Sequence, residues 1–326
     1  MSILEIKNLT IANKNTGQIL LDNISFVLDK GSTLGIVGES GSGKTLTGLS
    51  ILGLLNNSVF DIHQGSIIYN EIDILKLTET EIQKIRTKSI SIVFQEPMLS
   101  LNPVQKISTQ LNEVIKLHID SDPFQQKTIA RDILSKTGLD DAQKILDSYP
   151  HMLSGGQRQR IMIAIALVCN PDILIADEPT TALDVTIQAQ VLELIRKLRD
   201  ELSTAILLIT HDLGVIAENA DRVIVMYAGK KIEEASIAEL FNDPLHPYTK
   251  GLLKSVPSFD NKLGNENQSQ SQTRLEEIPG IVPPLADKPR GCSFAPRCSL
   301  STEKCRESSP SLKQKGQDHT VACWVV

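Results

Sequence analysis

The sequence has few aromatic residues and no long apolar run. Aromatic residues make up 4% of the 326 residues, which argues against a surface that stacks nucleic-acid bases. The net charge of −6 argues against a non-specific nucleic-acid binder, because such proteins carry an excess of basic residues. Apolar runs such as residues 206–209 are far shorter than the roughly 20 residues of a membrane span. The first residues show no secretory signal, so we expect a cytosolic protein that reaches a membrane only through a partner.

Cysteines are few and unevenly placed. Cys169 lies alone in an apolar segment, and we expect it to be a buried apolar residue. Cys292, Cys298, Cys305 and Cys323 lie close to the C-terminal end. Disulfides are not expected in a reducing cytosol, so these four thiols need another explanation.

Strands alternate with helices over the first 255 residues. This order predicts a parallel α/β sheet, and the length corresponds to about two domains. A helix is expected at residues 44–55, a mainly helical region at about 98–165, and an apolar helical stripe between residues 187 and 202. The expected strands are residues 4–9, 19–28, 33–37, 173–176, 205–210 and 222–227.

A glycine-rich loop follows the strand expected at residues 33–37. Residues 38–45 read Gly-Glu-Ser-Gly-Ser-Gly-Lys-Thr and fit the P-loop pattern G-x-x-x-x-G-K-[ST]. Glycines let backbone N–H groups surround phosphate oxygens, and the following helix directs its positive end at the same anion. We expect Lys44 to reach the β- and γ-phosphates and the Thr45 hydroxyl to ligate Mg²⁺. The predicted nucleotide contacts here are Gly38, Ser40, Gly41, Ser42, Gly43, Lys44 and Thr45.

Two carboxylates follow the apolar strand expected at residues 173–176. Asp177, at the strand end, is placed to hold Mg²⁺ through its water shell. Glu178, one residue further, is placed to polarise a water for in-line attack on the γ-phosphate. The alternative is a solvated acidic turn, which a P-loop in the same chain disfavours.

Further motifs lie in a fixed order around these two. Residues 153–157 read Leu-Ser-Gly-Gly-Gln, residues 181–184 read Thr-Ala-Leu-Asp, Gln95 follows an apolar run, and so does His211. Together with the P-loop they resemble the motifs of ATP-binding cassette (ABC) ATPases, over about residues 3–255. The resemblance implies an α/β fold of the P-loop NTPase class: a RecA-like core, an antiparallel β subdomain and a helical subdomain at about 98–165.

The resemblance also implies roles for single residues. Lys44, Glu178 and His211 would be catalytic, with His211 contacting the γ-phosphate, and Gln95 would complete the Mg²⁺ shell with Thr45 and Asp177. Ile19 would replace the aromatic side chain that often stacks on adenine. The signature of one cassette closes on the ATP of another in a head-to-tail dimer, where Asp184 would also act. The signature residues are Ser154, Gly155, Gly156 and Gln157, which are expected to begin a helix and offer free N–H groups to an anion.

Longer phrases resemble the peptide and nickel importer branch of this family. They include residues 95–103, 149–151, 245–249 and 278–284. The resemblance implies an ABC ATPase domain at 1–257, a flexible linker at 258–277 and a small cysteine-rich C-terminal module at 278–326. It implies an ATPase subunit peripheral on the cytoplasmic side of the cell membrane. The implied partners are a second ATPase subunit (a paralogue or the same chain), two permeases whose coupling helix docks near Gln95 and the 98–150 region, and indirectly an extracellular solute-binding protein.

The solute is predicted to be a di- or oligopeptide, and nickel or a metal chelate is the alternative. A soluble ABC ATPase that acts on ribosomes or DNA is disfavoured, because such proteins usually carry two cassettes or a long coiled coil. A non-hydrolysing regulatory cassette is the third alternative, although the chain has all three expected catalytic residues. The segment His246-Pro247-Tyr248 is interpreted as a helix-breaking turn that marks the family and carries no chemistry.

The four thiols near the C-terminal end suggest a metal site. They lack the paired C-x₂₋₄-C spacing of structural zinc sites. Their spacing resembles that of a C-terminal module that carries a [4Fe–4S] cluster in some peptide importers. We therefore predict a [4Fe–4S] cluster on Cys292, Cys298, Cys305 and Cys323, with Zn²⁺ as the alternative and free thiols third. Arg297 and His319 would then donate hydrogen bonds to sulfur.

Overall fold

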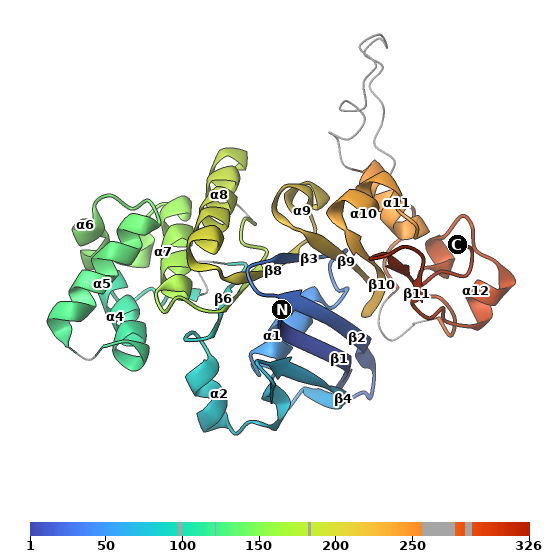
Figure 1. The fold of residues 1–326 in the computed structure, drawn as a ribbon, viewed down its shortest axis with the longest axis horizontal. Helices are drawn as coiled ribbons and strands as arrows, with labels where there is room; N and C mark the ends of the chain where they lie inside the picture. The colour runs from blue at the N-terminus through green and yellow to red at the C-terminus, as the bar shows by residue number, and fades with distance from the viewer. Residues whose placement is uncertain (97–99, 121, 182–183, 256–277, 284–288) are drawn as a thin grey trace, which may run out of the picture.

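The computed structural model describes residues 1–96, 100–120, 122–181, 184–255, 278–283 and 289–326. The linker predicted at 258–277 lies outside these residues. Within them, the strands form one large mixed sheet and a smaller antiparallel sheet beside it, and helices pack around the large sheet (Figure 1).

The large sheet has a parallel centre and an antiparallel margin. Its strand order is β11-β12-β10-β9-β3-β8-β7-β6. Parallel pairing joins β9, β3, β8, β7 and β6, whereas β10, β12 and β11 pair antiparallel. The strands are β3 (Thr33–Val37), β6 (Ile90–Val93), β7 (Ile173–Asp177), β8 (Ala205–Thr210), β9 (Arg222–Tyr227), β10 (Lys230–Ser236), β11 (Lys313–Gln314) and β12 (Thr320–Val321).

The small sheet is wholly antiparallel. Its order is β2-β1-β4-β5, built from β1 (Ser2–Asn13), β2 (Ile19–Asp29), β4 (Phe60–Tyr69) and β5 (Ile72–Asp73). This confirms the strands expected at residues 4–9 and 19–28, and it agrees with the antiparallel β subdomain that the family resemblance implies. The expected strands 33–37, 205–210 and 222–227 coincide with β3, β8 and β9.

Helices cover the large sheet, and a further group of helices lies beyond one edge of it. α1 (Lys44–Ile51) follows β3 and ends before the predicted residue 55, because Gly53 takes a positive φ of 59° and turns the chain. A group of helices lies beyond β6 in Figure 1: α4 (Ile107–His118), α5 (Pro123–Lys136), α6 (Ala142–Asp147) and α7 (Gly155–Leu167). This group confirms that the region at about 98–165 is mainly helical.

The remaining helices follow the order of the chain. They are α2 (Glu79–Ile85), α8 (Val185–Leu202), α9 (Leu213–Asn219), α10 (Ile237–Asn242), α11 (Pro247–Lys254), α12 (Glu303–Glu307) and the 3₁₀ turns η1 (Ile74–Lys76), η2 (Pro150–Met152) and η4 (Ala295–Arg297). None of the helices in the described part of the chain has the length and apolar character needed to cross a membrane.

Successive side chains of the central strands enter two separate cores. In β8, Ile206 and Leu208 pack with the helices, whereas Leu207 and Ile209 pack with the small sheet. This alternation follows from the two-residue period of a strand. Both faces are covered, which explains why these strands are apolar without interruption.

The C-terminal segment from residue 278 to residue 326, called the tail below, joins the large sheet directly through its described residues. Val321 of β12 pairs with Glu233 of β10, and Lys313 of β11 pairs in turn with Val321. Burial of this junction is nearly complete, since Glu233 and Val321 are inaccessible to solvent. The separate cysteine-rich module at 278–326 stays a prediction. Within the described residues, β11 and β12 of this segment extend the large sheet.

Leu207→Ala is expected to destabilise the protein by about 2–5 kcal/mol, the usual cost of such a cavity in a core. Leu207 is fully buried between the two sheets. The free energy of unfolding in urea measures the effect. Leu117→Ala is the matched control, because this leucine is 73% exposed and its loss should cost less than about 0.5 kcal/mol. Equal losses in both variants would contradict the two-core arrangement.

Candidate functional site

The loop between β3 and α1 is shaped by backbone contacts that require glycine. A Cβ atom added to Gly38 would lie 2.2 Å from the Met226 carbonyl oxygen of β9. Gly43 has a φ of 98° and precedes the first residue of α1 without a side-chain cap. The first N–H groups of α1 are therefore free of a side-chain acceptor and add to the positive end of the helix dipole.

Lys44 points back into this loop. Its side chain is buried, and its Nζ donates hydrogen bonds to the carbonyl oxygens of Gly38 (2.8 Å) and Glu39 (3.2 Å). Burial lowers the pKa of Lys44, while Glu178, Asp177 and Glu39 oppose that shift. A buried cation beside free N–H groups is an anion-binding arrangement.

The hydroxyl group of Ser42 is a further polar group in this loop. The Ser42 hydroxyl oxygen is buried and makes no hydrogen bond within the described residues. Buried hydroxyls normally have a partner, so a ligand oxygen would satisfy this one.

Two hard oxygen donors face each other across the loop. The Thr45 hydroxyl donates to Asp177 Oδ1 at 3.2 Å. Burial raises the pKa of Asp177, and the Thr45 hydrogen bond partly offsets this. A hydroxyl and a carboxylate are ligands that Mg²⁺ prefers, so this pair fits the predicted metal.

Glu178 is the centre of a hydrogen-bonded group. Its carboxylate accepts from Gln95 Nε2 at 2.9 Å and from the Thr181 hydroxyl at 2.8 Å, and it lies 3.2 Å from His211 Nδ1. Its backbone adopts a φ of 46°, and its N–H donates to the Ile209 carbonyl oxygen. A positive φ at a non-glycine residue costs about 1–3 kcal/mol, and it turns Glu178 out of β7 toward the loop.

Most of these groups line one cavity of about 590 Å³, although Gly38, Ser42 and Asp177 are not among its lining residues. The structure therefore brings together the predicted P-loop, Gln95, Glu178 and His211. Ile19 does not line this cavity, whereas its neighbour Leu20 does. The lining residues are Leu20, Ser40, Gly41, Gly43, Lys44, Thr45, Leu46, Gln95, Glu178, Thr181 and His211.

The signature residues lie outside that cavity. Ser154 caps α7: its hydroxyl accepts from the Gln157 N–H at 3.3 Å, and Gln157 Oε1 accepts from the Ser154 N–H at 2.9 Å. Gly155 begins α7, and Gly156 lies against Ile187 of α8. Asp184 is exposed and caps α8 through the Ile187 N–H at 3.0 Å. Within a single chain, these residues therefore do not line the cavity at the P-loop.

The tail residues differ from the predictions made for them. Among the residues that the structure describes, no group of three or more His, Cys, Asp or Glu side chains is arranged to hold a metal ion. This does not support a [4Fe–4S] cluster or Zn²⁺ on Cys292, Cys298, Cys305 and Cys323. Burial raises the pKa of the Cys292 and Cys298 thiols, and the two other thiols raise it further.

Arg297 and His319 bind carboxylates within the described residues. Arg297 binds Glu39 of the P-loop, and His319 Nε2 lies 2.8 Å from Glu233 Oε1. The prediction that they donate to sulfur is therefore wrong for this structure, because two carboxylates take these donors: Glu39, which is partly buried, and Glu233, which is fully buried and needs a partner for its charge.

Two contributors were missed at the sequence level. Thr181 follows the Asp-Glu pair by three residues, and that spacing was the only local signal of its contact with Glu178.

The interpretation of His246-Pro247-Tyr248 as a helix-breaking turn was wrong: Pro247 begins α11, and His246 Nδ1 caps it by accepting from the Tyr248 N–H at 3.0 Å. The Tyr248 hydroxyl also accepts from the Glu39 N–H at 2.9 Å.

Comparison with protein families gives two matches. Residues 21–181 match the family described as ABC transporter. Residues 232–305 match the family described as oligopeptide/dipeptide transporter, C-terminal region.

Curated relatives are similar along nearly the whole chain. The oligopeptide transport ATP-binding protein AppD of Bacillus subtilis is 48% identical over 99% of this chain and 97% of its own length. A protein of Brucella melitensis described as a peptide import ATP-binding protein is 45% identical, over 98% of this chain and 96% of its own length.

Solved structures share the fold of the larger part of the chain. The ATP-binding cassette MJ0796, in a dimeric post-hydrolysis state with ADP and Pi, has a TM-score of 0.64 and 28% identity, covering 72% of this chain and 98% of that one. The cbiO1 protein of Clostridium perfringens, part of the ABC transporter complex cbiONQ, has a TM-score of 0.65 and 27% identity, covering 74% of this chain and 91% of that one.

Asp177→Asn is expected to stabilise the protein in the absence of nucleotide and metal. Because burial raises the pKa of Asp177, the folded state holds this proton more tightly than the unfolded state does. Stability at this site is therefore present below the ordinary pKa of 3.8 and is lost as pH rises through the folded-state value. Asparagine cannot ionise and so avoids this loss of stability. The free energy of unfolding in urea should therefore exceed that of the wild type by more at neutral pH than at acidic pH. Asp132→Asn, at an exposed position, is the control, and a destabilised Asp177→Asn at neutral pH would contradict the expectation.

Proposed function

This chain belongs to the ABC transporter family of ATPases, and we propose that it is the ATP-hydrolysing subunit of an importer for di- and oligopeptides. The similarity to the AppD protein, which extends through the C-terminal region, carries the proposal. The charge arrangement around Lys44, Asp177 and Glu178 supports the hydrolytic part of it. The relatives named above give no support to nickel as the solute or to a ribosome- or DNA-associated role.

The loop at residues 38–45 would bind the triphosphate. Lys44 would exchange its carbonyl partners for phosphate oxygens, which are stronger acceptors for an ammonium group. The Ser42 hydroxyl and the first N–H groups of α1 would complete the cradle. Leu20 would contact the base at the mouth of the cavity, and Ile19 stays the sequence-based prediction for the same contact.

Glu178 would act as the general base. Its carboxylate is held by Gln95, Thr181 and His211, so its position is fixed before the substrate arrives. A positioned base of this kind typically contributes 10²–10⁴-fold to a rate. His211 would bind the γ-phosphate and orient the attacking water from the other side.

Thr45 and Asp177 would hold Mg²⁺, with Gln95 completing its shell. When bound, the ion would neutralise charge on the β- and γ-phosphates. Asp177 is buried at a cost to its charged form, and a cation would remove that cost.

The signature would act in a second cassette. Ser154, Gly155, Gly156 and Gln157 lie outside the cavity of their own chain, so only another chain could bring them to its ATP. This geometry supports a head-to-tail dimer with a paralogue or with a copy of this chain, and Asp184 would lie at the same interface.

The membrane part of the importer would consist of partner chains. Two permease subunits would carry the pathway and bind this subunit near Gln95 and the 98–150 region, which leaves it peripheral on the cytoplasmic side of the cell membrane. An extracellular solute-binding protein would select the peptide.

A [4Fe–4S] cluster or Zn²⁺ on the tail cysteines stays a prediction from sequence alone. Among the described residues, no group of three or more His, Cys, Asp or Glu side chains is arranged to hold a metal ion, and the proposed reaction assigns no step to the tail cysteines.

Glu178→Gln should keep ATP binding and lower turnover by more than about 100-fold, because glutamine cannot accept the proton of the attacking water. Lys44→Ala should lose both ATP binding and turnover, since it removes the charge that would hold the phosphates. Equilibrium binding of ATP and release of phosphate measure the two effects. Normal turnover in Glu178→Gln would falsify its assigned role.

Deletion of the gene should abolish uptake of labelled di- and oligopeptides and leave Ni²⁺ uptake unchanged. Cells that also lack other ATPases of this kind should be used, so that none can substitute. Wild-type chain should restore uptake, and Glu178→Gln should not. Loss of Ni²⁺ uptake alone would make the chain a metal importer subunit, and unchanged uptake of both solutes would contradict an importer role.

A further inference from the structure

Arg297 connects the C-terminal tail to the phosphate-binding loop. Its Nη1 donates to both carboxylate oxygens of Glu39, at 3.0 and 2.9 Å, although the two residues are 258 positions apart. Its Nε donates to the Pro279 carbonyl oxygen at 3.0 Å and its Nη2 to that of Ile278 at 3.3 Å. The Arg297 side chain is only 6% exposed, so the guanidinium is fixed on several sides.

Aromatic packing fixes the same part of the tail. Phe294 is buried, and its ring lies edge-on to Tyr227 and Tyr248, with centroids 5.3 and 5.4 Å away. Tyr248 in turn accepts the Glu39 N–H. Burial raises the pKa of Tyr248, so its hydroxyl stays protonated at physiological pH. Both the backbone and the side chain of Glu39 are therefore held by residues outside the loop.

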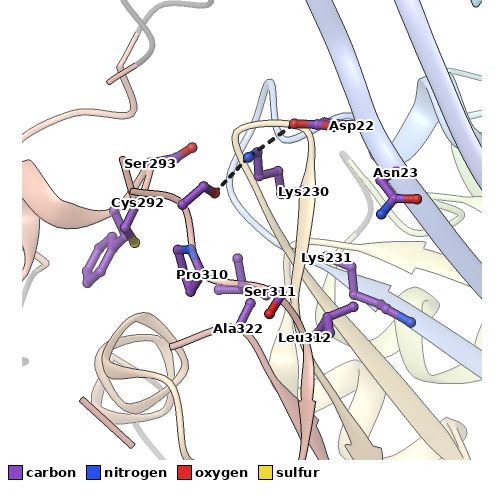
Figure 2. Close-up of a pocket in the computed structure, with 13 residues that line it drawn as sticks. Asp22, Asn23, Lys230, Lys231, Cys292, Ser293, Pro310, Ser311, Leu312 and Ala322 are labelled. Carbon is purple, nitrogen blue, oxygen red and sulfur yellow. Dashed lines mark hydrogen bonds and ion pairs between the residues drawn. The ribbon is translucent and has the colours of Figure 1, made fainter. Parts of the chain in front are cut away.

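Gly229, in the turn between β9 and β10, and Lys230, the first residue of β10, connect the tail to the loop indirectly. Lys230 Nζ donates to the Ser309 hydroxyl of the tail at 2.8 Å and lies 3.1 Å from Asp22 Oδ2, and Figure 2 shows Lys230 between Asp22 and the tail. The adjacent Gly229 donates its N–H to the Ser42 carbonyl oxygen at 3.0 Å. The Lys230 contact borders a cavity of about 330 Å³, which is lined by residues of the tail, of β2 and of β10.

Glu39 places a negative charge beside a site for a highly anionic ligand. Its carbonyl oxygen binds Lys44 Nζ at 3.2 Å, and its charge acts on Lys44. An unpaired carboxylate here would repel phosphate groups and compete for Lys44. A guanidinium neutralises a carboxylate in a defined geometry.

We propose that Arg297 is a positioning residue for ATP binding, which neutralises Glu39 from the tail and fixes the loop that carries Lys44. The inference rests on the proposed nucleotide site at residues 38–45. It gives the C-terminal tail a task in the ATPase reaction that is independent of any metal on its cysteines. ATP binding by the cassette is accordingly coupled to docking of the tail.

The test is MgATP affinity of the full chain, measured by calorimetry at low and high salt. Arg297→Ala should weaken binding by about tenfold, the effect of one lost charge-assisted contact, and high salt should reduce the difference because it screens Glu39. Glu39→Gln combined with Arg297→Ala should regain most of the affinity, since the repelling charge is gone. Arg290→Ala, an exposed arginine of the same tail, should bind like the wild type.

The outcomes separate this inference from the nucleotide site itself. Wild-type affinity in Arg297→Ala, or a double variant as weak as Arg297→Ala alone, would overturn the role of Arg297. Normal binding by Lys44→Ala would instead overturn the nucleotide site. If Arg297→Ala does not fold, as judged by circular dichroism, Arg297→Gln takes its place, because its amide can still donate to the Pro279 carbonyl oxygen but carries no charge.

Discussion

Parallel pairing sets Val37 beside Thr210 and Asp177 beside Ile209, so β3, β7 and β8 leave the sheet at one edge. Each strand is followed by a part of the proposed site: the P-loop after β3, Glu178 after β7 and His211 after β8. A shift of register by one residue would move every side chain of a strand to the opposite face. The two separate cores on the faces of the sheet make such a shift costly, and in this way core packing fixes the geometry of the site.

The site concentrates features that a stable fold would avoid. Lys44 and Asp177 are buried charged groups whose pKa values are shifted against ionisation, and Glu178 has a positive φ. The Ser42 hydroxyl has no partner among the described residues. Each feature costs stability in the absence of ligand, and in the proposed site a magnesium-bound triphosphate would offset the cost of the buried charges. Strain and unpaired polar groups are typical of sites built for a ligand.

The tail belongs to this arrangement instead of standing apart from it. β12 extends the sheet beside β10, the His319–Glu233 pair is buried at that junction, and Arg297 reaches the loop itself. The cysteine-rich composition of the tail suggested a small module held by a metal. Composition says nothing about where a segment packs, and the carboxylates Glu39 and Glu233 that bind the tail lie far from it in the sequence.

The sequence by itself determined the fold class, the order of the motifs and most of the proposed nucleotide site, because each depends on local signals. A P-loop needs consecutive glycines, and a buried strand needs an unbroken apolar run. Only the tertiary structure decided which distant residues meet: Thr181 with Glu178, Leu20 in place of Ile19 at the cavity, and Arg297 and Tyr248 with Glu39. These contacts join positions up to 258 residues apart. Side-chain partners at that separation follow from the packing of whole strands and helices, which no local pattern encodes.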